Sequence, residues 1–97
     1  MAKMREADSM GFNLGILVAQ CEKDGSMETV VSGIIQFNAN LNYEAIVAQY
    51  KAEFPGFEAQ VTGSETVFSA PIKYTKDIAA RRNEVARIEL AQEYKLA

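Results

Sequence analysis

The stretch CEKDGSME separates two apolar runs, and its Asp24-Gly25 pair constrains the fold more than any other feature of the chain. Asp-Gly is a preferred pair for a two-residue type I′ turn, because both central positions of that turn need a positive φ. With the turn placed here, the residues on either side pair outward in a fixed register. The sequence therefore predicts a long β-hairpin made of residues 12–23 and 26–37.

The predicted register sorts the hairpin side chains into two faces. One face is apolar almost throughout, because it stacks Phe12 with Phe37, Leu14 with Ile35, Ile16 with Gly33 and Val18 with Val31. The other face mixes apolar and polar side chains. A slip of one residue would mix the two sets, so this sorting favours the same register independently of the turn rule. We expect the first face to cover a core and the second to be too apolar for plain solvent surface.

A helix is predicted from Asn42 to the Pro55-Gly56 pair, packed on the apolar face of the hairpin. Asn42 is a good N-cap residue, and Leu41 and Ile46 stand at the positions of a hydrophobic staple. An apolar stripe follows with helical spacing: Tyr43, Ile46, Val47, Tyr50 and Phe54. Pro-Gly then ends the helix.

Residues 57–74 predict two further strands joined by the turn TGSE. Pro71 has no amide hydrogen to give to a ladder, so it indicates an edge strand. The segment from Lys76 to Ala97 lacks Gly and Pro and predicts a long helix, with Asp77 and Arg81 as an i,i+4 ion pair. Two apolar stripes on this helix indicate contacts with its own sheet and with a neighbouring subunit. A partly exposed helix end is the alternative.

The predicted fold class is α+β in the order β-β-α-β-β-α, with one antiparallel sheet and two helices. At 97 residues the chain has room for one domain, which we place at residues 11–97, after a flexible or arm-like N-terminus at residues 1–10. Helices on one face leave the other face of the sheet open. The strand order stays open, because the second hairpin fits on either side of the first.

The open face is predicted to be an interaction surface. A contiguous exposed apolar patch marks a contact, most often between two copies of one chain. We therefore expect a homodimer, with a partner interface formed by Leu17, Ala19, Val30 and Ile34. In the competing arrangement, the last helix of the chain covers Val30 and Ile34.

Catalytic chemistry finds little support in the sequence. The chain has no histidine, which excludes Ser-His and Cys-His catalysis and most transition-metal sites. The lone Cys21 is interpreted as a small apolar residue at a strand end, and no glycine-rich phosphate loop is present. We predict no catalytic residue, no metal and no cofactor, and we expect a protein that is not an enzyme. A small-molecule pocket between Tyr43, Tyr50 and Tyr74 is allowed but has no convergent polar group.

One segment of the chain is basic against an acidic whole. Residues 73–87 carry five basic and two acidic side chains, whereas the net charge of the chain is -3. On a helix these basic side chains would form a belt that contacts nucleic acid or an acidic partner: Lys73, Lys76, Arg81, Arg82 and Arg87. A solvated helix with internal ion pairs is the alternative interpretation.

The charged N-terminus is unlike a signal peptide, and no apolar run is long enough to span a bilayer. We expect a cytoplasmic protein without a membrane partner. The predicted function is that of a small intracellular adaptor or inhibitor, a class that includes viral proteins, which self-associates and binds another protein. Nucleic-acid binding through residues 73–87 is the alternative.

Overall fold

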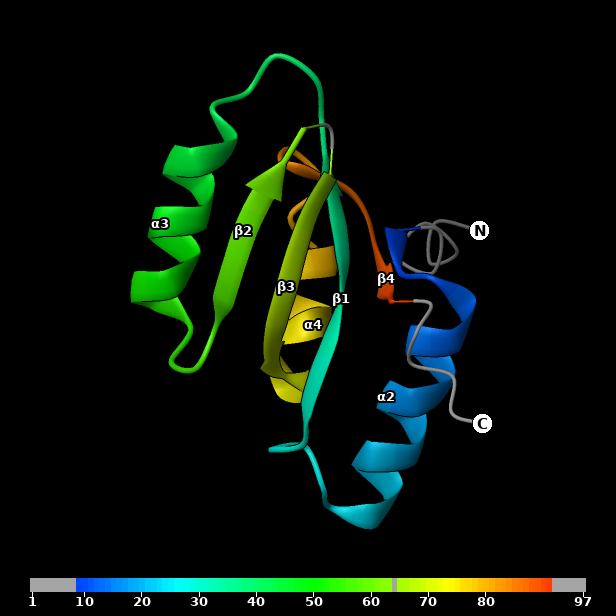
Figure 1. Cartoon of the computed structure of the whole chain (residues 1–97). Helices are drawn as coiled ribbons and strands as arrows, with labels where there is room; N and C mark the ends of the chain where they lie inside the picture. Colours follow the sequence, from blue (N-terminus) through cyan, green and yellow to red (C-terminus); the bar gives the residue numbers. More distant parts are fainter. Residues whose placement is uncertain (1–8, 64, 92–97) are drawn as a thin grey trace.

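The described part of the chain folds into a four-stranded antiparallel sheet with helices packed on one face (Figure 1). The computed structural model describes residues 9–63 and 65–91. Within these residues the strands are β1 (Val30–Phe37), β2 (Glu58–Thr62), β3 (Glu65–Pro71) and β4 (Val85–Leu90). The helices are α2 (Phe12–Asp24), α3 (Tyr43–Glu53), the 3-10 helix η1 (Ile72–Tyr74) and α4 (Thr75–Ala79). The predicted α+β class with an antiparallel sheet is confirmed.

The strands lie in the order β2-β3-β1-β4, and every neighbouring pair is antiparallel. β1 is central, with β3 on one side and β4 on the other. Ile35 of β1 faces Thr66 of β3 and Ile88 of β4, so the inner row of the sheet is continuous across three strands. This arrangement joins segments that are about fifty residues apart in the sequence (Figure 1).

The predicted first strand of the hairpin is wrong, because residues 12–24 form the helix α2. Asp24-Gly25 ends this helix: Gly25 has φ 76°, and its amide and that of Ser26 both donate to the carbonyl of Cys21. A glycine in the left-handed region satisfies the last carbonyls of a helix as readily as it makes a type I′ turn. Without this first strand, the predicted order of elements is also wrong. Of the two predicted hairpin strands, only the second is confirmed, as β1.

The middle of the chain follows the prediction. The side chain of Asn42 caps α3 by accepting from the amide of Ala45 at 3.1 Å. The helix ends where predicted, and Gly56 turns the chain with φ 92°. β2 and β3 then form the predicted hairpin, which turns at Gly63 with φ 72°.

Two predictions about the last third of the chain are wrong. β3 is an inner strand, and Pro71 is tolerated because it is the last residue of the strand, beyond the final pair between β2 and β3. The long helix from Lys76 is also absent: α4 ends at Ala79 and β4 follows from Val85. Pairing with β1 and burial of Ile88 outweigh the helical preference of this segment. Residues 92–97 lie outside the described residues.

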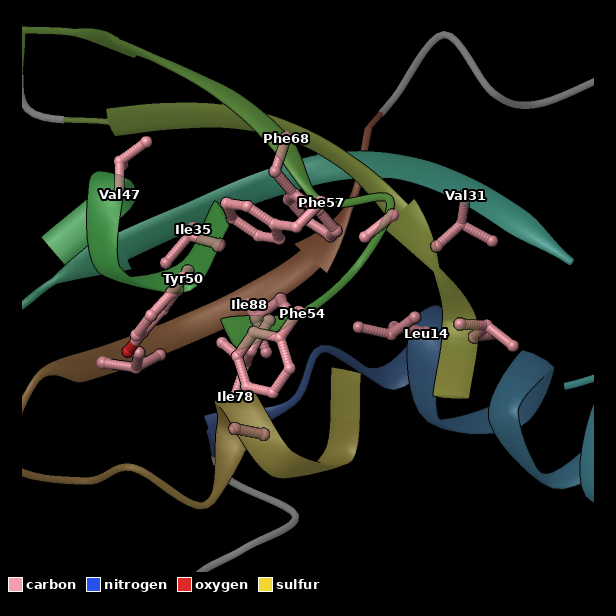
Figure 2. Close-up of a cluster of buried hydrophobic side chains, with 14 of the residues drawn as sticks. Leu14, Val31, Ile35, Val47, Tyr50, Phe54, Phe57, Phe68, Ile78 and Ile88 are labelled. Carbon is pink, nitrogen blue, oxygen red and sulfur yellow. The ribbon is translucent and has the colours of Figure 1, made fainter. Parts of the chain in front are cut away.

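The core lies between the sheet and the helices. Figure 2 shows Ile35, Phe68 and Ile88 of the sheet in one cluster with side chains of the helical layer, which include Leu14 of α2, Tyr50 of α3 and Ile78 of α4. All six of these side chains are buried. Since α2, α3 and α4 all bury residues in this cluster, the opposite face of the sheet receives none of them.

The start of the described chain lies along the outer edge of β4. Ser9 is buried, Met10 forms a parallel bridge with Ile88, and the amide of Gly11 donates to the carbonyl of Ile88 at 2.8 Å. A Cβ on Gly11 would lie 2.6 Å from the Cβ of Glu89, so a glycine permits this close approach. Residues 1–8 of the predicted N-terminal arm lie outside the described residues.

Candidate interaction surfaces

One face of the sheet carries no helix among residues 9–63 and 65–91, and it is built from cross-strand rows. Side chains that alternate with the buried ones point to this face, and residues paired across strands share a row. The rows at its centre are Val30 with Pro71, Ser32 with Ser69, and Ile34 with Val67. Beyond them the Gln36 amide donates to Glu65 Oε2 at 3.4 Å. We call this surface the open sheet face.

Apolar side chains are strongly exposed on the open sheet face. Val30 is 58% exposed and Val67 is 47% exposed. At the β4 edge a pocket of about 250 Å³ is lined by Ile34 of the sheet and by Phe12 of α2, which is 79% exposed. Phe12 therefore extends the apolar surface from Ile34 past the edge of the sheet.

The structure brings together two of the four predicted interface residues. Val30 and Ile34 lie on the open sheet face, and no helix in the described part of the chain covers them. Leu17 and Ala19 belong instead to α2, where Leu17 packs partly buried against the core and Ala19 is exposed.

Sequence reasoning missed three members of the surface. Val67 and Pro71 could have been predicted from the sequence, because they alternate with the buried Phe68 and Ala70 in β3. Phe12 was placed in the core by the predicted hairpin, and only the helical geometry of α2 turns it outward.

The predicted basic belt is divided among different elements, because the long helix does not form. Lys73 lies in η1, Lys76 in α4, Arg81 and Arg82 in the turn after α4, and Arg87 in β4. Four of these side chains pair with carboxylates: Lys73 with Glu28 at 2.6 Å, Lys76 with Glu22 at 2.8 Å, Arg87 with Glu89 at 3.1 Å, and Arg81 with Glu53. The carbonyl of Arg82 accepts from the side-chain amide of Asn38.

Arg81 occupies the most elaborate of these positions. Its guanidinium forms two hydrogen bonds with Glu53 and lies over the rings of Tyr50 and Phe54, about 5 Å from each centroid. The hydrogen bonds from Arg81 hold the pKa of Glu53 below its usual value. This arrangement joins α3 to the turn before β4, so Arg81 has a structural role.

The tyrosines proposed as a ligand pocket fill an aromatic cluster instead. Tyr43 stacks on Phe37 with centroids 5.4 Å apart, and Tyr74 lies 5.0 Å from Phe54. Tyr50 is fully buried, and its hydroxyl donates to Glu84 Oε1 at 2.7 Å. Burial and this hydrogen bond raise the pKa of Tyr50 well above its ordinary value.

A second concave surface lies between α3 and the outer strand β2. This groove has a volume of about 440 Å³ and is lined by Glu44, Val47, Ala48, Lys51, Ala59, Gln60 and Val61. The two elements that line it, α3 and β2, lie at the edge of the sheet opposite to α2 (Figure 1).

Among residues 9–63 and 65–91, no group of three or more His, Cys, Asp or Glu side chains is placed to hold a metal ion. No helix in the same residues has the length and apolar character needed to cross a membrane. Cys21 is a buried free thiol on α2. Comparison with family models, with curated proteins and with solved structures found no match for this chain.

Proposed function

We propose that this chain is a non-catalytic interaction protein of the adaptor or inhibitor type, which self-associates through the open sheet face and binds another protein. The observation that carries the proposal is the exposure of Val30, Val67 and Phe12 around Ile34, on and beside a sheet face that no helix of the described residues covers. Antiparallel sheets can leave one face in water, but that face is then mostly polar. An apolar centre on it supports a contact surface.

The rows of the open sheet face support a homodimer as the form of self-association. Consider a two-fold axis that runs parallel to the strands, above the open sheet face and midway between β1 and β3. Each row of one copy then lies over the same row of the other. Ile34 then lies over Val67 of the second copy, and Val30 lies over Pro71. The two apolar rows therefore meet apolar rows.

The same axis brings no like charges into register. Glu89 lies in the row of Gln60, and Arg87 lies in the row of Thr62. The rotation places each of these charged side chains over the neutral member of its row. Glu65 is likewise placed over Gln36. Electrostatic repulsion therefore does not oppose the apolar contact at the centre.

The size of the face predicts a weak dimer. Four strands at their usual spacing and about seven residues of length give roughly 450 Å² of flat area per copy. Side-chain relief enlarges the accessible area, so the total buried in a dimer falls near the lower limit of about 1,200 Å² for specific interfaces. We expect micromolar rather than nanomolar self-association.

Sedimentation equilibrium over micromolar to millimolar protein tests the proposal. The wild-type chain should associate with increasing concentration, and Ile34→Asp should remain monomeric with an unchanged far-UV CD spectrum. Ala19→Asp is the matched control, because Ala19 is exposed on α2 away from the open sheet face. A wild-type monomer at millimolar concentration would refute self-association. Loss of association only in Ala19→Asp would assign the contact to α2.

The ion pairs of residues 73–87 weigh against nucleic-acid binding as the function. A phosphate that contacts Lys73, Lys76, Arg81 or Arg87 would have to displace a carboxylate. Retention on immobilised nucleic acid that is weak at low salt would agree with this interpretation. Tight retention with a steep salt dependence would favour the alternative.

A further inference from the structure

The two edges of the sheet differ in whether further main chain pairs with them. At the β4 edge, Met10 and Gly11 pair with Ile88 and so cover the centre of the strand. At the other edge β2 pairs with β3 alone. Among the described residues, no main-chain hydrogen bond outside that ladder involves Glu58–Thr62. The outer edge of β2 is therefore available to a further strand.

The groove between α3 and β2 lies along this free edge. Its apolar lining comes from Val47 and Ala48 of α3 and from Ala59 and Val61 of β2. Gln60 also lines the groove, although its side chain alternates to the other face of the sheet. The groove therefore reaches the main-chain edge of β2, where an added strand would make its hydrogen bonds.

Opposite charges mark the two ends of the groove. Glu44 and Lys51 are two turns apart on α3, about 10.5 Å along the helix axis. Figure 1 shows α3 and β2 running in opposite directions, so Lys51 lies toward the start of β2 and Glu44 toward its end. Neither side chain has an ion-pair partner within the described residues, unlike Lys73, Lys76 and Arg87.

We infer that this groove binds an extended peptide segment of a partner protein, which adds to the outer edge of β2 as an antiparallel strand. The inference names the partner class for the interaction function proposed above and rests on that function, but not on the homodimer. An antiparallel segment begins beside Glu44 and ends beside Lys51. The segment that fits carries a basic residue near its start, an apolar residue at the centre and an acidic residue near its end, all on one face of the strand.

The charges select a partner segment over a second copy of β2. In an antiparallel pair of β2 strands, the second copy would turn Ala59 and Val61 toward the groove and Glu58 toward the other face of the sheet. Neither Glu44 nor Lys51 would then gain an ion-pair partner. A segment with a basic residue beside Glu44 and an acidic residue beside Lys51 gains both ion pairs.

Two capped peptides of identical composition test the inference. In SKTITES the Lys, Ile and Glu side chains share one face of a strand, spaced about 13 to 14 Å from Lys to Glu. In SETITKS the two charges are exchanged. Titration of isotopically labelled protein by NMR should shift the amide signals of Glu58–Thr62 with SKTITES, and SETITKS should bind about fivefold more weakly. The double variant Glu44→Lys with Lys51→Glu should reverse this preference.

A pair of matched variants locates the site. Ala48 is exposed in the groove, whereas Ala45 is exposed on α3 outside it, so a Trp at either position leaves the core intact. Ala48→Trp should weaken SKTITES at least tenfold, and Ala45→Trp should bind as the wild type does. Equal binding by both variants would overturn the inference, as would the absence of shifts in Glu58–Thr62 at millimolar peptide.

The titration is repeated with Ile34→Asp, which separates this inference from the homodimer. Binding of SKTITES to this variant supports a peptide site that is independent of self-association. A wild-type protein that dimerises but binds neither peptide overturns the inference and leaves self-association standing. A monomer that binds SKTITES refutes only self-association.

Discussion

The ring of Phe68 on β3 occupies the space beside Gly33 on β1 that a side chain would fill. The two residues are paired across the strands, and both point into the core. A Cβ on Gly33 would lie 2.9 Å from a ring carbon of Phe68 and 2.1 Å from the carbonyl oxygen of Glu89 on β4. The central strand therefore requires glycine at this position.

Gly33→Ala should lower the free energy of unfolding by about 2 to 3 kcal/mol, because the methyl group overlaps main chain that cannot move without breaking the pairing of β1 with β4. Urea unfolding measures the effect. Gly15→Ala is the control, since the nearest atom to its added Cβ is Met10 Sδ at 4.0 Å and it should stabilise α2 by about 0.5 to 1 kcal/mol. Equal stability of wild type and Gly33→Ala would contradict the packing of the central strands.

The secondary structure of residues 12–24 is tested at Gln20, which is exposed on α2. In a helix Gln20→Ala should be more stable than Gln20→Val by about 0.5 kcal/mol, because a β-branched side chain loses rotamer freedom there. In a strand Gln20→Val should instead be the more stable of the two variants. Paired denaturation curves of the two variants decide between the helix and the hairpin.

The helix α2 shows why local patterns failed in this part of the chain. Its buried residues Leu14, Val18 and Cys21 have helical spacing, but nearly every residue from Phe12 to Val18 is apolar or glycine. A wholly apolar segment satisfies the strand period and the helix period equally. The Asp24-Gly25 pair was then interpreted as a hairpin turn, although it ends the helix α2. By contrast, three local features all predict the helix α3: the N-cap Asn42, the apolar stripe and the Pro55-Gly56 pair at its end.

Tyr50 couples stability to alkaline pH. Its pKa is raised in the folded protein by burial and by the hydrogen bond to Glu84, so the folded state holds the phenol proton more tightly than the unfolded state. This contribution is present below the unfolded pKa of about 10 and falls by up to about 1.4 kcal/mol per pH unit above it. Tyr50→Phe should be about 1 kcal/mol less stable at neutral pH and should lose this part of the alkaline decline. Unfolding curves at pH 8 to 11 measure the difference, with Tyr43→Phe as the control.

Arg81 should stabilise the fold through the planar shape of its guanidinium as well as through its charge. Arg81→Lys keeps the charge but loses the two-point contact with Glu53 and the stacking on Tyr50 and Phe54, so we expect a loss of about 1 kcal/mol. Lys73→Ala should leave stability close to that of the wild type, because its pair with Glu28 is exposed. Thermal unfolding compares the two variants. Arg81→Lys with wild-type stability would contradict the structural role of Arg81.

The last third of the chain could not be predicted from local sequence for a different reason. Residues 75–90 contain good helix formers, and only α4 uses that preference. β4 exists because Val85 and Ile88 complete the core beside β1, a contact between segments far apart in the chain. Local propensity carries no information about such a contact. The basic belt was an outcome of the same wrong helix.

The open sheet face was predictable only in part. Val30 and Ile34 were correctly placed on one face of the sheet, because alternation within β1 does not depend on which strand pairs with it. Leu17 and Ala19 were grouped with them only through the incorrect hairpin. The groove between α3 and β2 was missed altogether, since it depends on β2 being an edge strand, and the strand order was open.

The central claim is that two copies meet through the open sheet face, and a mixed disulfide tests it most directly. Ile34→Cys and Val67→Cys are prepared as separate single variants, mixed and oxidised gently, with the wild type as the control because Cys21 is buried. If the two-fold axis runs between β1 and β3, the mixture should form a covalent heterodimer faster than either variant alone forms a homodimer. Cross-linking no faster in the mixture than in the separate variants would contradict the proposed interface.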